Sequence, residues 1–230
     1  GKLMKLDLKK LKLRDVNEKL QNLDRKKNDR NFTIINPEGN HAVCAGLTEE
    51  MNINIKGHVG YYCAGMNQKA QITIEGNVGT GVAENMMSGK VHVKGNASQS
   101  AGATAHGGLL IIDGDASSRC GISMKGIDIV VKGSVGHMSG FMSQSGNMVV
   151  CGDAGEALGD SLYETNIYIR GKVKSLGADC VEKKMDIKHI KKLNLLLKEA
   201  NIKNHKAESF KRYGSAKKLY NFKIDNISNY

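Results

Sequence analysis

One short pattern recurs seven times along the chain at a constant spacing of 19 residues. Each copy is an alternating apolar run that ends in glycine, as in "INIKG", "ITIEG" and "VHVKG". The positions four and two residues before the glycine, and two residues after it, are apolar in every copy. The glycines are Gly57, Gly76, Gly95, Gly114, Gly133, Gly152 and Gly171. A regular repeat of this length predicts a stack of similar units, each contacting its neighbours.

The repeat predicts an all-β fold, a right-handed parallel β-helix of about seven 19-residue coils with helical N- and C-terminal caps. Alternation with period two indicates a strand with one buried face. We expect the seven glycines to be structural turn residues at positive-φ corners, because glycine adopts that conformation without strain. Small side chains would let successive coils lie about 4.8 Å apart. The right-handed sense follows from the general rule for parallel crossovers.

The stretch "IVVKGSVGHMSG" at residues 129–140 looks like a phosphate-binding glycine loop. It is the fifth copy of the repeat, whereas a nucleotide loop occurs once, between a strand and a helix. The sequence therefore favours a structural role for its glycines.

The chain divides into three regions. Residues 1–30 form an N-terminal strand and helix cap, 31–180 the parallel β-helix, and 181–230 a C-terminal helix with an aromatic and basic tail. A partial coil is expected in "FTIINPEGNHAVCAGL". The first helix should span 14–25, burying Val16, Leu20 and Leu23. Asp186 should cap the second, which runs to about residue 202 with one apolar face of Ile187, Ile190, Leu193, Leu197 and Ala200. The aromatic tail should pack on the last coils or dock on another subunit.

Composition excludes several classes of protein. The net charge is +11, but the basic residues concentrate at the two ends of the chain, which indicates solvated helix faces more than a nucleic-acid site. Five cysteines without a CxxC pair predict neither a disulfide framework nor a zinc ribbon. No run approaches the roughly 18 apolar residues of a membrane span. We therefore expect a cytoplasmic protein with no membrane partner.

The residues predict no catalytic, cofactor-binding or metal site. The histidines fall at different positions of the repeat. The polar column one residue after the glycines should make turn hydrogen bonds: Asn77, Asn96, Asp115, Ser134 and Asp153. The column before the glycines alternates in sign and should form a ladder of ion pairs: Lys56, Glu75, Lys94, Asp113 and Lys132. Cys151 continues that column, so its thiol should be accessible to solvent. A methionine cluster should fill the core: Met86, Met87, Met124, Met138 and Met142.

The uncharged stretch "SQSAGATAHGG" at 98–108 is the candidate for a flat face that meets a partner. It joins two coils and is built almost entirely of small residues. We expect its side chains to lie at the surface.

The chain resembles a known family over about residues 31–230. Its runs "GHVGYYCAGMN", "GDAGEALGDSLYE" and "KRYGSAKKLYNF" are similar to the glycine-repeat (GXGXG) domain at the C-terminus of the glutamate synthase large subunit. The resemblance is greatest to the stand-alone form of that domain, the β-helix subunit of split glutamate synthase-like and N-methylglutamate synthase-like enzymes. The β-helical subunit of formylmethanofuran dehydrogenase is a more distant likeness.

The resemblance implies a structural subunit without a catalytic site of its own. In that family the β-helix braces a class II glutamine amidotransferase subunit against an FMN-dependent synthase subunit. It implies no cofactor in this chain and assigns FMN, with or without an iron–sulfur cluster, to the synthase partner. Two alternatives stay open: a β-helical subunit of another oxidoreductase, and a free-standing binding module that uses its basic ends. Homo-oligomers fit either reading.

Overall fold

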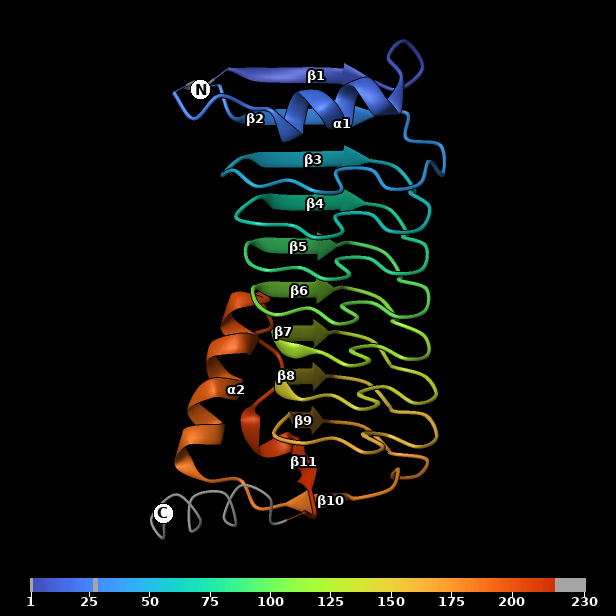
Figure 1. Cartoon of the computed structure of the whole chain (residues 1–230). Helices are drawn as coiled ribbons and strands as arrows, with labels where there is room; N and C mark the ends of the chain where they lie inside the picture. Colours follow the sequence, from blue (N-terminus) through green and yellow to red (C-terminus); the bar gives the residue numbers. More distant parts are fainter. Residues whose placement is uncertain (1, 27–28, 218–230) are drawn as a thin grey trace, which may run out of the picture.

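The computed structural model describes residues 2–26 and 29–217, which form one tall stack of strands with two helices beside it (Figure 1). The chain order is β1 (Leu3–Asp7), α1 (Leu13–Gln21), β2 (Asn31–Ile35), β3 (Asn52–Lys56), β4 (Gln71–Glu75), β5 (Lys90–Val93), β6 (Leu109–Ile112), β7 (Lys125–Val131), β8 (Ser145–Val150), β9 (Asn166–Ile169), β10 (Cys180–Lys183), α2 (Ile187–Glu199), the 3₁₀ turn η1 (Ala207–Ser209) and β11 (Lys211–Ser215).

The strands from β1 to β9 pair in parallel and in chain order. From β3 onward each strand pairs with the one a full repeat later, so that Ile53 lies beside Ile72 and Met148 beside Ile167. The predicted right-handed parallel β-helix of about seven coils is confirmed. The expected partial coil is present as β2, and β1 adds one more strand above it.

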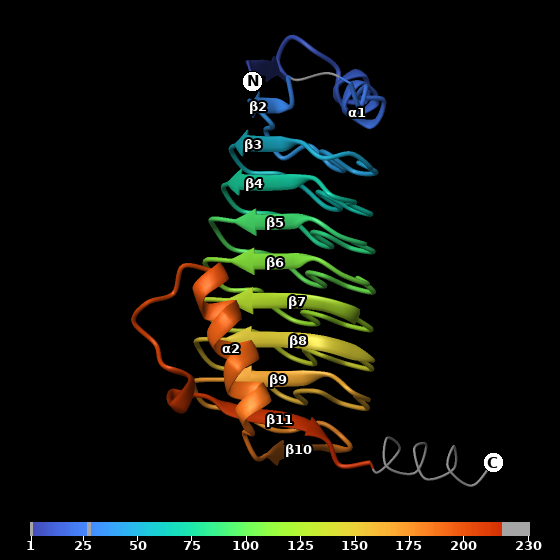
Figure 2. The ribbon, with the colours of Figure 1, turned by 90° about the vertical axis from the view of Figure 1, so that its left-hand side faces the viewer.

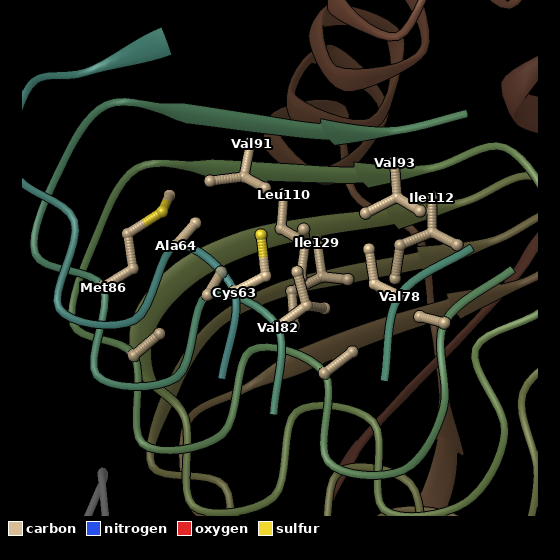
Figure 3. Close-up of a cluster of buried hydrophobic side chains, with 14 of the residues drawn as sticks. Cys63, Ala64, Val78, Val82, Met86, Val91, Val93, Leu110, Ile112 and Ile129 are labelled. Atoms are coloured by element: carbon tan, nitrogen blue, oxygen red, sulfur yellow. The ribbon is translucent and has the colours of Figure 1, made fainter. Parts of the chain in front are cut away.

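The core runs through the centre of the coils. Every apolar position that defined the repeat is buried except Val173, which is partly buried. Figure 3 shows successive coils contributing Val91, Leu110 and Ile129 at one level of the strand, with Val93 and Ile112 at the next. Alternating inward side chains on a parallel strand thus form continuous columns of Ile, Val and Leu.

The turn glycines are needed for a different reason from the expected one. Among the seven, only Gly57 has a positive φ, of 135°. From Gly95 onward each glycine N–H donates to the carbonyl of the glycine in the previous coil, as from Gly133 to Gly114 at 3.0 Å. A Cβ at Gly133 would lie 2.7 Å from that carbonyl oxygen. Close backbone approach therefore excludes a side chain here.

Positive φ occurs instead in the turns opposite the strands. The column seven residues after the glycine has φ between 56° and 74°: Ala64, Ala83, Gly102, Gly121, Gly140 and Gly159. The left-handed conformation reverses the chain inside each coil, and only a small residue fits there beside the core.

A ladder of side-chain hydrogen bonds runs along one corner of the rod. His58 accepts the backbone N–H of Asn77 at 2.9 Å. The same bond repeats once per coil at 2.7–2.9 Å, with Asn77, Asn96, Asp115, Ser134 and Asp153 as the next acceptors. These side chains do form hydrogen bonds, but not within their own turn as predicted: each bond joins one coil to the next, 19 residues further along the chain.

The helix α1 closes the N-terminal end of the stack. Val16 and Leu20 are buried, as predicted, but the helix ends at Gln21 instead of residue 25, and Leu23 beyond it is only partly buried. Asn17 donates to the Ala42 carbonyl and accepts the N–H of Cys44, both at 2.9 Å. The side chain of Gln21 donates to the Ala45 carbonyl at 2.8 Å. The helix thus supplies both an apolar cover and hydrogen-bond partners for the first coil.

The helix α2 lies along the strand face and not across the open end (Figures 1 and 2). The lower end is closed by β11, which pairs antiparallel with both β9 and β10. Leu193, Leu197 and Ala200 are buried as predicted, but Ile187 is 72% exposed. Asp186 caps the helix as expected, and its N–H bonds to His189 Nδ1 at 3.1 Å.

The outward residues under α2 differ from those above it. The column three residues before the glycines is apolar and buried from β6 to β9: Ile111, Val130, Val149 and Tyr168. On β3 to β5 the same column holds Asn54, Thr73 and His92. The change from polar to apolar marks where α2 packs, a signal present in the sequence that the prediction did not use.

Two predictions for the outward column before the glycines were wrong. Cys151 is buried under α2 and its neighbours, and burial raises the pKa of its thiol to about 11. In the described part of the chain, the predicted ladder contains one ion pair, between Lys132 Nζ and Asp113 Oδ1 at 2.9 Å. Glu75 instead accepts a hydrogen bond from Asn54 at 2.6 Å.

The first part of the aromatic tail packs back on the last coils. Phe210 is buried against α2, and Tyr213 joins the main core from β11. The remaining tail residues of that prediction, among them Tyr220 and Phe222, lie outside the described residues.

Candidate docking surface

The turns opposite the strands form one broad surface, which we call the turn face. It consists of six eight-residue segments, one per coil: 61–68, 80–87, 99–106, 118–125, 137–144 and 156–163. These 48 residues include only five charged ones, namely Glu84, Arg119, Lys125, Glu156 and Asp160. Since 21 of the 48 are buried, the five charged residues make up about a fifth of the 27 that are not, still below the quarter of the whole chain that is charged. Depletion of charge on an exposed surface is typical of protein–protein interfaces.

Large apolar side chains project from the turn face. Five of them are between 42% and 55% exposed: Tyr61, Met66, Met87, Met142 and Tyr163. Tyrosine and methionine are enriched at interfaces because they bury much apolar area and adapt to the partner. The turn face thus carries the chemistry of a contact surface along most of the rod.

Backbone hydrogen bonds between coils hold this surface rigid. Met66 donates to the Glu84 carbonyl and Met142 to the Asp160 carbonyl, both at 2.8 Å. Both methionines have positive φ, 58° and 51°, and their side chains are nearly half exposed. At the upper end the Tyr61 ring stacks on His41 with centroids 3.6 Å apart. A preformed surface loses little conformational entropy on binding.

The stretch 98–108 does not form the expected flat face of exposed side chains. Ala101, Ala103 and Ala105 are buried within their coil. Ala101 and Ala105 belong to the core, at positions where the preceding coil has the larger Val82 and Met86, whereas Ala103 is buried outside that core cluster. The exposed apolar side chains of the turn face are instead methionines and tyrosines on the other coils.

The methionine cluster divides between core and surface. Met86 and Met124 are fully buried, as predicted. Met87 and Met142 are exposed, and Met138 is half-buried, so the prediction of core filling was wrong for these three. The exposed and half-buried methionines differ from the buried ones only in their position within the repeat, because they stand in columns that point outward.

Other reactive side chains are scattered. The described residues contain no group of three or more His, Cys, Asp or Glu placed to hold a metal ion. All five cysteines are buried and unbridged. One small polar cluster lies on the strand face, where His92 Nε2 contacts Asp113 Oδ1 at 2.8 Å beside Lys132. Burial raises the pKa of Asp113, but the bonds from His92 and Lys132 outweigh it and leave the pKa lowered.

Neither helix in the described part of the chain has the length and apolar character needed to cross a bilayer.

Fold and surface together define a β-solenoid built on stacked glycines, with one long side that is poor in charge. The chain belongs to the GXGXG-motif family, whose model matches residues 16–223. It is 58% identical over 225 residues to Protein GlxC of Rhizobium meliloti (strain 1021), covering 98% of this chain and 99% of that one. The resemblance to the glycine-repeat domain of glutamate synthase is confirmed.

Proposed function

We propose that this chain is a non-catalytic scaffold subunit of a glutamate synthase-like complex. In this proposal it braces a class II glutamine amidotransferase subunit against an FMN-dependent synthase subunit for the formation of glutamate or N-methylglutamate. FMN, with or without an iron–sulfur cluster, belongs to the synthase partner. The turn face is the observation that carries the proposal, because it is long, rigid and poor in charge on a member of the GXGXG family.

The length of the turn face suits two partners. Its exposed apolar side chains extend from Tyr61 in the first full coil to Tyr163 near the last. The six coils are separated by five spacings of about 4.8 Å, so the turn face is about 24 Å long, enough for contact with more than one subunit. Apolar anchors surrounded by uncharged polar residues also match the usual anatomy of an interface core.

Co-purification tests the proposal directly. The tagged chain is isolated from its native cells, the partners are identified by mass spectrometry, and the eluate is scanned for flavin absorbance. We expect an amidotransferase and a flavin-containing synthase subunit. A colourless eluate that contains neither of these proteins contradicts the proposal.

Three variants locate the contact. Met87→Glu and Met142→Glu each place a charge on the turn face and should reduce recovery of the partners at least about tenfold, since a buried unpaired charge weakens an interface strongly. Leu195→Glu is the matched control, because Leu195 on the outer side of α2 is as exposed as Met87, at 47%. Equal loss in all three variants would show that the turn face is not the contact.

A further inference from the structure

A basic pocket lies at the lower end of the rod, next to the last segment of the turn face. It has a volume of about 290 Å³ and lies between the start of β9, the strand β11 and the first turn of α2. Its walls carry five basic side chains and one acidic one: Lys183, Lys188, His189, Arg212, Lys217 and Glu164. The volume is at the low end for a small-molecule site.

Arg212 is fixed at one wall of this pocket. Its Nε and Nη2 donate to the Lys184 carbonyl at 3.0 and 2.6 Å, and Nη1 donates to Asn166 Oδ1 at 2.9 Å. These acceptors are neutral and use three of the five N–H donors of a guanidinium. Within the described residues no carboxylate oxygen lies within 4.0 Å of Arg212. The more distant charges of Tyr168 and Asp186 raise the pKa of Arg212, but burial outweighs them and leaves that pKa lowered, so an anion would stabilise the half-buried guanidinium.

The neighbouring side chains add positive potential. Within the described residues, Lys183 and Lys188 likewise form no ion pair, whereas Lys217 pairs with Asp179 at 3.4 Å. Burial and the charges of Arg212 and Lys188 lower the pKa of His189, against an opposing contribution from Asp186. The lowered pKa of His189 therefore indicates an electropositive environment, and a bound anion would offset these positive charges and raise that pKa.

We propose that this pocket binds a small molecule through a carboxylate or phosphate group, held by the remaining donors of Arg212 and neutralised by Lys183 and Lys188. The planar fork of a guanidinium matches both oxyanions. The proposal does not rest on the scaffold function, because the groups that would hold the anion lie on β10, α2 and β11, although Tyr163 of the turn face also lines the pocket.

Calorimetric titration with inorganic phosphate, and separately with succinate, tests the site at constant ionic strength. We expect saturable binding of at least one probe, and the stronger one identifies the class of anion. Arg212→Gln should weaken it at least about tenfold, because charged hydrogen bonds are lost. The double change Lys183→Gln and Lys188→Gln should also weaken it while leaving the structural bonds of Arg212 intact.

Lys19→Gln is the matched control, because it removes one charge from an exposed position on α1 at the opposite end. Binding should be unchanged there. An NMR titration should show the pKa of His189 rising when the probe binds. The proposal fails if neither probe saturates, if Lys19→Gln weakens binding as much as Arg212→Gln, or if the pKa of His189 does not move.

Discussion

The strand face changes character between β5 and β6. Above this point its central outward column is Asn54, Thr73 and His92, and the surface faces solvent. Below it the column is Ile111, Val130, Val149 and Tyr168, and α2 with the following segment covers it. The inward columns are the same in both halves. The repeat thus determines the rod, whereas the outward positions determine what packs on it.

The difference also explains why the predicted exposure of Cys151 was wrong. A position has no fixed exposure merely because it points away from the coil axis. Cys151 stands in the same column as the exposed Lys56 and Lys94, yet lies in the covered half. A second apolar layer can therefore be recognised only when the outward columns are compared from coil to coil.

The largest effect should come from a polar group placed under α2. Val149→Asn should lower the free energy of unfolding by about 4 kcal/mol, since apolar burial is lost and a buried amide has no partner. Thr73→Asn, at the same column in the uncovered half, should change it by less than about 0.5 kcal/mol. Urea denaturation of both variants measures this, and equal losses would contradict the division of the face.

Truncating a side chain of α2 that packs on the strand face should lower the free energy of unfolding somewhat less. Leu196 is fully buried against the strand face, and Leu196→Ala should cost about 3 kcal/mol. Leu195→Ala changes the adjacent, exposed leucine and should be nearly neutral. Thermal unfolding by circular dichroism compares the pair. A neutral Leu196→Ala would mean that α2 contributes little to stability.

The thiol of Cys151 reports opening of the covered half. With a pKa of about 11, its thiolate fraction at pH 8 is about a hundredfold below that of an ordinary thiol. Native protein should therefore react very slowly with Ellman's reagent, and Leu196→Ala should accelerate labelling of Cys151. Mass spectrometry of the labelled peptide assigns the site. Rapid labelling of Cys151 in the native protein would contradict its burial.

The smallest effect concerns Asp113, at the border of the two halves. Its lowered folded-state pKa means that the ionised carboxylate stabilises the protein fully above about pH 4, and that this is lost as the pH falls through the folded value. Asp113→Asn should make the free energy of unfolding less dependent on pH in the acid range, and should lower it at pH 7 by at most about 1 kcal/mol. Glu75 stands in the same column and forms no ion pair within the described residues, so Glu75→Gln should leave this pH dependence unchanged. Stability curves between pH 3 and 7 test both.

The sequence predicted the rod because its spacing is strict and its inward columns are uniformly apolar. The register of Ile53 with Ile72 follows from the spacing alone. The conformation of the turns could not be predicted from the sequence, because glycine is selected both where two backbones come close together and where φ is positive. Gly133 is required by the carbonyl of Gly114, whereas Gly121 has a φ of 69°.

The surfaces were predicted less well. Small residues at 98–108 indicated an exposed face, but Ala101 and Ala105 line the interior of their coil. The exposed Met87 and Met142 were assigned to the core because methionine is apolar and adaptable. Only the column of each residue within its coil separates inside from outside. The position of α2 needed a comparison between coils, which a single repeat unit cannot provide.

The ladder from His58 to Asp153 has a consequence for the length of the rod. Each coil offers the next the same acceptor and receives the same donor, so one coil can follow another without altering either end. Duplication of one 19-residue unit within the uncovered half would move the two ends apart by about 4.8 Å and leave α1, α2 and β11 in their own contacts. The number of 19-residue repeats therefore sets the length of the rod, and with it the distance between partners bound at its two ends.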